Sequence, residues 1–245
     1  MAVDEVLLES AAAGGPCTWR LYRWQEPTLS LGYFQAYADR EGHRASLGCP
    51  AVRRMSGGGA IVHDQEITYS LTIPPGHPWA GRGQGMYEAV HSTLVEWLLE
   101  GGIRAFLWDH PPLSEHGRQP FLCFQRRAPG DVVVGDAKVA GSAQRRSRGA
   151  VLQHGSIVLG RSAAAPEVGG LAGAMPSAWE PDRLDRLDRL LAGWLDGLSR
   201  RLNITWGARG LFAAEGAAAG RLAEAKYASD AWTLARGRGI LGENL

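Results

Sequence analysis

Cysteine is scarce in this chain of 245 residues: Cys17, Cys49 and Cys123 are the three present, and no two have the spacing of a metal-binding pair. An odd number of scattered cysteines predicts neither a disulfide framework nor a zinc site. It is typical of a protein from a reducing cytosol. The formal net charge is only +1, so the composition indicates no general attraction to nucleic acid or to a membrane surface.

Long apolar runs are also missing, because no stretch of about eighteen apolar residues occurs and a membrane-spanning helix needs that length. The first residues, MAVDEVLLESAAAGG, place Asp4, Glu5 and Glu9 within an apolar pattern, which indicates an amphipathic helix and not a secretory signal. We therefore expect a cytoplasmic location. The motif GxxxxGK[ST] is absent, which excludes a phosphate-binding loop of the nucleotide-hydrolase kind. The motif GxSxG is absent as well, so no motif supports a Ser/His/Asp triad.

What is present is enough apolar material for a full core, since hydrophobic residues make up 45% of the chain. No internal repeat and no clear linker interrupt it, so we predict one domain over 1–245, with a core over about 15–205 and a short helical end.

The apolar patterns predict strands and helices without a βαβ rhythm, which favours an α+β fold with a mixed, mostly antiparallel sheet flanked by helices. Gly135-Asp136 and Arg148-Gly149 are the turns expected between the last three strands. We expect strands at 18–24, 28–34, 50–54, 60–63, 67–73, 131–134, 137–146 and 151–159, helices at 84–99, 180–202 and 217–226, and a loop at 160–178.

The segment Arg53-Arg54-Met55-Ser56-Gly57-Gly58-Gly59-Ala60 lies between two predicted strands. Glycines expose backbone N–H groups to a ligand, and arginines bind anions, so the segment is a candidate cradle for an acyl or phosphate-bearing ligand. A flexible connection or a bulge would give the same pattern.

Cys123 and Lys138 form the second candidate. The bend expected at Ala128-Pro129-Gly130 can bring the lysine back toward the cysteine, and a nearby cation favours the nucleophilic thiolate. A buried, unreactive thiol and a solvated lysine remain the alternative. His63 and His154 can be a base or a ligand, or structural histidines, and no His, Cys and Asp residues show metal spacing.

Taken together, these segments resemble the lipoate and octanoate transfer enzymes of the biotin/lipoate protein ligase superfamily. RRMSGGGAIVHDQEITYSL (53–71) is similar to the first signature of that superfamily, and GDAKVAGSAQRR (135–146) with VLQHGSIVL (151–159) is similar to the second. LYRWQEPTLSLGYFQ (21–35) resembles the segment before the first signature, and AKYASDAWT (225–233) resembles the end of the catalytic domain. The resemblance therefore spans nearly the whole chain and implies the catalytic fold of that superfamily.

Within the superfamily, the chain looks most like the cysteine-dependent octanoyltransferases of the type directed to glycine cleavage protein H, which carry a cysteine ahead of the hairpin lysine. The GRGRxGR-like loop of the biotin branch is absent. This chain has the all-glycine Gly57–Gly59 where the octanoyltransferase branch often has GGRA. An ATP-dependent lipoate-protein ligase, including the catalytic subunit of a two-chain ligase, therefore remains an alternative. An amidotransferase that takes octanoyl from protein H, and a non-catalytic binding protein, are further alternatives.

The resemblance implies that Cys123 takes octanoyl from acyl carrier protein as a thioester. The acyl group then passes to a lysine of glycine cleavage protein H or of a lipoyl domain of a 2-oxoacid dehydrogenase, assisted by Lys138 and by backbone N–H groups near 138–141. We expect a monomer with no metal and no cofactor, with ATP and Mg²⁺ needed only by a ligase. The implied substrate-binding residues are Arg53, Ser56, Gly57, Gly58, Gly59, Ala60, His63, Gly141, Ser142, Ala143 and His154.

Overall fold

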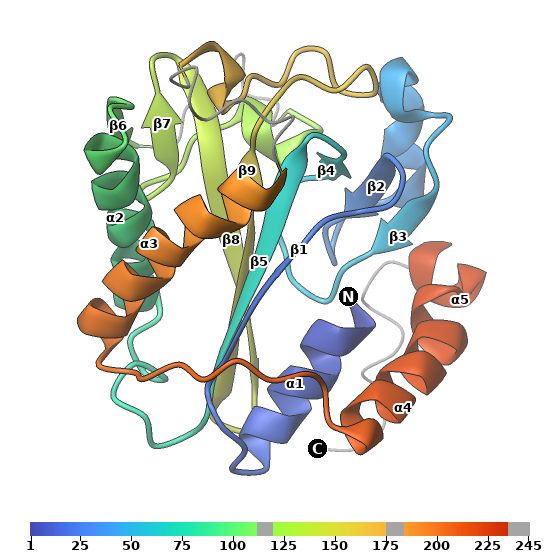
Figure 1. The fold of residues 1–245 in the computed structure, drawn as a ribbon. Coiled ribbons are helices and arrows are strands. Elements are labelled where there is room, and N and C mark those ends of the chain that lie inside the picture. Colours follow the sequence, from blue (N-terminus) through green and yellow to red (C-terminus); the bar gives the residue numbers. More distant parts are fainter. Residues whose placement is uncertain (112–119, 175–183, 235–245) are drawn as a thin grey trace.

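The computed structural model describes residues 1–111, 120–174 and 184–234, and in the last segment side chains are described from Leu191 onward. Two sheets organise this part of the chain (Figure 1). A six-stranded sheet, antiparallel throughout, has the order β1-β5-β9-β8-β7-β6, and a three-stranded sheet has the order β3-β2-β4. In the small sheet β2 runs parallel to β3 and antiparallel to β4. The predicted α+β class with a mostly antiparallel sheet is confirmed.

The strands of the large sheet are β1 (Thr18–Tyr22), β5 (Glu66–Ile73), β6 (Ala105–Leu107), β7 (Val132–Val134), β8 (Ala137–Ser147) and β9 (Ala150–Val158). Those of the small sheet are β2 (Thr28–Leu31), β3 (Ala51–Arg53) and β4 (Ile61–His63). The helices are α1 (Ala2–Ala12), α2 (Gln84–Glu100), α3 (Leu184–Leu202), α4 (Ala213–Leu222) and α5 (Asp230–Leu234). Short 3-10 turns are η1 (Tyr37–Gly42), η2 (Arg44–Ser46), η4 (Cys123–Gln125) and η5 (Leu171–Gly173), and η7 (Ala223–Tyr227) is a π-helical turn.

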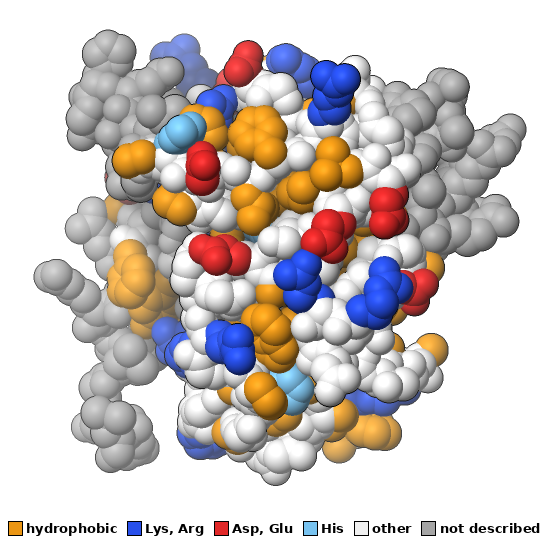
Figure 2. All heavy atoms as spheres, turned by 90° about the vertical axis from the view of Figure 1, so that its left-hand side faces the viewer, with side chains coloured by type: hydrophobic (Ala, Val, Ile, Leu, Met, Phe, Trp, Pro, Cys, Tyr) orange, Lys and Arg blue, Asp and Glu red, His pale blue; other side chains and the backbone are white. Residues whose placement is uncertain are grey.

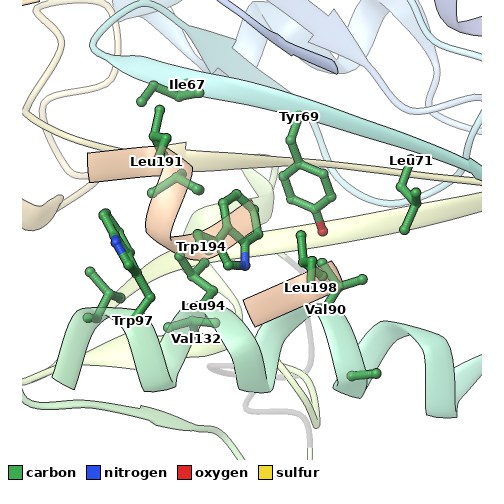
Figure 3. Close-up of a cluster of buried hydrophobic side chains, with 14 of the residues drawn as sticks. Ile67, Tyr69, Leu71, Val90, Leu94, Trp97, Val132, Leu191, Trp194 and Leu198 are labelled. Carbon is green, nitrogen blue, oxygen red and sulfur yellow. The ribbon is translucent and has the colours of Figure 1, made fainter. Parts of the chain in front are cut away.

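One face of the large sheet is covered by α2 and α3, and the main hydrophobic core lies between the sheet and these two helices (Figures 1 and 3). Trp194 is fully buried at its centre, with its ring edge-on to Tyr69 at 5.3 Å and to Trp19 at 4.8 Å. Its indole N–H donates to Thr93 Oγ1 at 3.1 Å, so the polar atom of this large side chain is satisfied. Leu94 on α2 is also fully buried, as the helical spacing of its apolar neighbours predicts.

The opposite face of the sheet is covered by α1 and, farther along, by the small sheet. Leu8 and Ala11 of α1 pack with Leu152 of β9 and with Met55. The helix α4 lies beside α1 (Figure 1), and Glu5 of α1 accepts hydrogen bonds from the residues of η7. Between α1 and the small sheet this face carries polar and small residues, and the candidate site lies there.

Several details differ from the sequence expectations. The strands on either side of Pro27 belong to different sheets and do not pair with each other. The short strand β6 was not expected. The helix expected at 217–226 begins earlier, and it continues through η7 toward α5. The helix expected at 180–202 is observed over Leu184–Leu202, and its predicted start lies outside the described residues.

The described part of the surface on the α2 side mixes acidic and basic side chains, with hydrophobic side chains between them (Figure 2). No helix in the described segments is long and apolar enough to span a bilayer.

Candidate active site

Cys123 is held in place by the backbone of the glycine-rich segment. It opens η4, and the residue before it, Leu122, forms a parallel bridge with Ala60. The N–H of Cys123 donates to Ala60 O at 2.7 Å, and the N–H of Ala60 donates to Phe121 O at 3.0 Å. The glycine-rich segment and the cysteine segment are therefore joined directly by main-chain hydrogen bonds.

Lys138 reaches Cys123 from strand β8. Its Nζ lies 3.7 Å from the Cys123 sulfur and 2.8 Å from Asp131 Oδ2, and the lysine is buried. A β-bulge in the pairing with β7, between Val132 and Val133, interrupts the alternation of side chains here. The predicted approach of Lys138 to Cys123 is thus present in the geometry, and its catalytic role stays a prediction.

Asp131 is a residue that the sequence analysis missed. Its carboxylate is 1% exposed and accepts from the Tyr87 hydroxyl at 2.7 Å and from the Ala128 N–H at 2.7 Å, in addition to pairing with Lys138. Burial and the adjacent Asp131 charge raise the pKa of Tyr87 well above its usual value, so this hydroxyl stays a donor. The buried lysine therefore has both a counter-charge and a rigid support.

Gly141 makes room for the lysine. A Cβ atom at this position would lie 2.5 Å from Lys138 Cε, 2.8 Å from its Nζ and 3.2 Å from Asp131 Oδ1. These separations to the lysine carbon and nitrogen are far below van der Waals contact. A larger residue here would force the flexible end of Lys138 to move, because the lysine side chain passes over Gly141.

Arg54, and not the predicted Arg53, faces the candidate site. Its guanidinium donates to the Ser30 carbonyl at 3.0 Å and to the carbonyls of Gly57 and Gly59 at 2.8 and 2.7 Å, which fixes the glycine-rich segment. Burial lowers the pKa of Arg54 to about 10, and interaction with Cys123 opposes that shift. Among the described residues no carboxylate lies within ion-pair distance of Arg54, so its buried charge is not neutralised by an acid.

Arg53 has a structural role. Its guanidinium donates to carbonyl oxygens of residues 32, 33 and 35 and, at 2.8 Å, to Thr233 O near the end of α5. It is 1% exposed and does not line the cavity described below. The expectation that Arg53 contacts the substrate therefore finds no support in its position.

A small cavity of about 50 Å³ lies beside Cys123. Tyr22, Thr68 and Ser156 line it without having been predicted, and Arg54, expected only as part of the glycine-rich segment, lines it too. The predicted residues that line it are Gly57, Gly58, His63, Cys123, Gly141, Ser142, Ala143 and His154. Ser56, Gly59 and Ala60 support the wall from behind, because each is hydrogen bonded to a residue of the lining. Lys138 touches the cysteine and also borders a separate surface hollow.

The floor of this cavity is a row of residues in register across four strands. Gly141 pairs with Ser156, Ser156 with Thr68, and Thr68 with Tyr22. Because neighbouring strands are about 4.8 Å apart, the row spans about 14 Å. One end of the row lies at Lys138 and Cys123.

The two histidines of the cavity differ in their partners. His154 Nε2 is hydrogen bonded to the Ser56 hydroxyl, and burial lowers the pKa of His154 to about 4, although Asp4 nearby opposes the shift. His63 Nδ1 lies 2.9 Å from Glu66 Oε1, and its ring stacks on Trp24 with the ring centres 4.2 Å apart. His63 Nε2 is buried and has no partner among the described residues. His154 is thus hydrogen bonded through Nε2, whereas Nε2 of His63 has no partner among the described residues.

No group of three or more His, Cys, Asp or Glu side chains in the described segments is arranged to hold a metal ion. The arrangement instead combines a thiol, a buried ammonium, a carboxylate that holds the ammonium, and an adjacent cavity. This combination suits transfer of an acyl group through sulfur.

Comparison with protein families places this site in context. The model of the lipoyl protein ligase A/B catalytic domain matches residues 1–165. Octanoyltransferase LipM of Kyrpidia tusciae is 40% identical over a region that covers 65% of this chain and 61% of the relative. Octanoyltransferase LipM of Geobacillus kaustophilus is 33% identical, with 96% of this chain and 93% of the relative covered. The matched part thus spans about three fifths of the first relative and nearly all of the second.

Solved structures share the fold at low sequence identity. A putative lipoate protein ligase from T. acidophilum with bound lipoic acid superimposes with a TM-score of 0.72 at 20% identity, covering 95% of this chain and 91% of that one. A lipoate-protein ligase A bound with ATP gives 0.71 at 21% identity, covering 95% and 92%. At this identity the likeness establishes the architecture alone.

Proposed function

The chain belongs to the lipoyl protein ligase A/B catalytic domain family, and from this membership we propose that it is an octanoyltransferase of protein lipoylation. The relatives named octanoyltransferase LipM support this choice within the family. The observation that carries it is the 3.7 Å approach of Lys138 Nζ to the Cys123 sulfur beside the cavity.

In the first step, the Cys123 thiolate attacks the thioester carbonyl of octanoyl-acyl carrier protein. A new sulfur–carbon bond forms, the carrier's thiolate leaves, and octanoyl remains on Cys123. Lys138 stabilises the cysteine thiolate and then the oxygen of the tetrahedral intermediate, with backbone N–H groups near 138–141 as further donors. The carrier thiolate takes up a proton from solvent when it departs.

In the second step, the amine of an acceptor lysine attacks the acyl-enzyme. The amide bond forms, the Cys123 thiolate leaves, and the nitrogen loses a proton to solvent. A thioester is higher in free energy than an amide, so no ATP is required, and the covalent intermediate implies ping-pong kinetics. The acceptor lysine belongs to a lipoyl domain or to glycine cleavage protein H.

The charges around Cys123 favour this mechanism. Lys138 and Asp131 neutralise each other, whereas Arg54 brings a buried positive charge with no acid partner among the described residues. The cavity favours binding of the acyl chain by about 0.8 kcal/mol for each CH₂ group that it buries.

Intact-protein mass spectrometry after mixing with octanoyl-acyl carrier protein, without ATP, tests the proposal. We expect an octanoyl adduct that hydroxylamine removes and that maps to Cys123. Cys123→Ala should abolish the adduct, and the matched variant Cys49→Ala, which also removes a partly exposed thiol, should retain it.

Other outcomes would redirect the assignment. Acceptor modification only with ATP and free acid would identify an ATP-dependent ligase. Acylation by octanoylated protein H, but not by the carrier protein, would identify an amidotransferase. Octanoyl transfer by Cys123→Ala at the full rate would exclude the thioester mechanism. The absence of a cofactor, the monomeric state and the cytoplasmic location stay predictions.

A further inference from the structure

Two side chains of α2 approach the site from the face of the large sheet that lies opposite the cavity. Successive residues of β8 point to opposite faces, so Gly141 lies under Lys138, whereas the Ser142 hydroxyl contacts α2. Tyr87 and His91 are one helical turn apart on α2, and their ring centres lie 4.3 Å apart. Both side chains reach the same two segments, the loop before β7 and the middle of β8.

The Tyr87 hydroxyl connects these two segments first. It donates to Asp131 Oδ1 at 2.7 Å and accepts from the Ser142 N–H at 3.3 Å. The other carboxylate oxygen of Asp131 lies 2.8 Å from Lys138 Nζ. Tyr87 therefore orients the carboxylate that in turn binds the ammonium.

His91 connects the same two segments one turn later. Its Nδ1 lies 2.6 Å from Gly130 O, and a carbonyl only accepts, so Nδ1 carries the proton. In the neutral ring Nε2 is then an acceptor, and the Ser142 hydroxyl donates to it at 2.6 Å. Burial lowers the pKa of His91 to about 4, so the ring is neutral at neutral pH. His91 thus joins the residue before Asp131 to the residue after Gly141.

Gly130 allows α2 to lie this close to the loop. Its φ of +90° is in the left-handed region, and a Cβ atom there would lie 2.9 Å from carbon atoms of the Tyr87 ring. His91 is fully buried, and neither it nor Tyr87 lines the cavity beside Cys123. The two side chains are therefore placed to act on the lysine and its carboxylate, and not on the acyl group.

We propose that Tyr87 and His91 are positioning residues that hold the Lys138 ammonium at Cys123 by fixing Asp131 between β7 and β8. The inference rests on the proposed function, in which Lys138 assists the cysteine. A lysine side chain is a flexible four-carbon stem, so its ammonium stays at one place only if its partner is fixed. When Asp131 loses a donor, its carboxylate can turn, and the ammonium paired with it moves away from the sulfur.

The test measures how fast iodoacetamide alkylates Cys123 at a series of pH values, with the labelled peptide identified by mass spectrometry. In Tyr87→Phe we expect alkylation at neutral pH to be about three- to tenfold slower, the loss of one hydrogen bond. The pH of half-maximal rate should rise, because a cation at the sulfur favours the thiolate. At high pH the rate should return to the native maximum, which a general loosening of the fold would not produce.

Variants of His91 provide a second comparison. His91→Phe removes both of its hydrogen bonds and should slow alkylation in the same way. His91→Asn keeps a donor near the position of Nδ1 and should lie between the native protein and His91→Phe. Once Lys138→Ala has removed the ammonium, Tyr87→Phe should change the rate by less than about twofold.

Thr93→Val is the matched control. Thr93 is also buried on α2, and its hydroxyl donates to Val90 O at 2.8 Å and accepts from the Trp194 indole. This variant should lower the melting temperature and keep the native pH dependence of alkylation. A folded Tyr87→Phe protein with the native pH dependence, or a Thr93→Val protein with an equally large displacement, would overturn the inference. If His91→Phe does not fold, Tyr87→Phe decides alone.

The proposed function can fail separately, because alkylation requires no acyl donor. If the native protein forms no acyl-enzyme but Tyr87→Phe still slows alkylation, the octanoyltransferase assignment fails and the positioning role stands. If the acyl-enzyme forms, Tyr87→Phe should lower kcat of acylation and leave KM unchanged, since Tyr87 does not line the cavity. A raised KM with an unchanged kcat would contradict the inference.

Discussion

Replacing Gly141 with alanine should displace Lys138 without removing it. The new Cβ would lie 2.5 Å from the lysine Cε and 2.8 Å from its Nζ. Asp131 Oδ1, at 3.2 Å from the same point, limits the space on the side of the carboxylate. The ammonium must therefore leave the position in which it lies 3.7 Å from the Cys123 sulfur.

The size of the effect follows from the contact that is lost. A hydrogen bond to a charged group contributes about 1.5–3 kcal/mol, which corresponds to roughly a 10- to 150-fold lower rate of acyl-enzyme formation. The backbone at Gly141 is not in the left-handed region, so alanine introduces no strain of its own. Loss of the buried pair with Asp131 would lower the free energy of unfolding by up to about 3–5 kcal/mol.

The assay is a double-mutant cycle on the rate of Cys123 acylation, with melting temperatures measured in parallel. Once Lys138→Ala has removed the crowded atoms, Gly141→Ala should change the rate by less than about twofold. The reasoning fails if the two substitutions lower the rate independently, because alanine would then act through something other than the lysine.

Three further predictions address charge, pH and packing. Arg54→Met should slow alkylation of Cys123 by iodoacetamide at neutral pH about tenfold, which corresponds to about 1.4 kcal/mol. The control Arg53→Met should lower the melting temperature and leave the alkylation rate unchanged. Equal alkylation rates of the native and Arg54→Met proteins would contradict a role for the Arg54 charge. Burial lowers the pKa of His91 and of His154 from 6.5 to about 4, so between about pH 4 and pH 6.5 the unfolded chain binds more protons than the folded protein. The urea concentration at the unfolding midpoint should therefore fall as the pH is lowered through this range. A midpoint that stays constant would refute this prediction. Trp194→Ala should reduce the free energy of unfolding by about 3–5 kcal/mol, measured by urea denaturation, and a loss below about 1 kcal/mol would show that the core closes around the gap.

The strands and helices whose position depends on the local pattern of apolar and turn residues were predictable from the sequence. The two hairpin turns appear as expected, with Gly135, Arg148 and Gly149 all at positive φ. The division into two sheets was not predictable, because β2 finds its partners in β3 and β4 by long-range pairing. The strand β6 was missed because it has only three residues, too few to show a period.

The same distinction applies to the site. The turn residues before β7 allowed the meeting of Cys123 and Lys138 to be anticipated. The choice between Arg53 and Arg54 depends on which of two adjacent residues faces the cavity, and a three-residue strand does not reveal this. Asp131 gave only a weak signal, since an acid beside a glycine before a strand usually marks a turn.

The pairing of α1 with α4 has a consequence for synthesis on the ribosome. About 200 residues separate the end of α1 from the start of α4, and translation at about 5–20 residues per second takes roughly 10–40 s to cross them. The strand β9, which also covers α1, is likewise made late. During that interval the side of α1 that packs on α4 lacks its native partner, whereas Met55 and β5, which also pack on α1, have already been made.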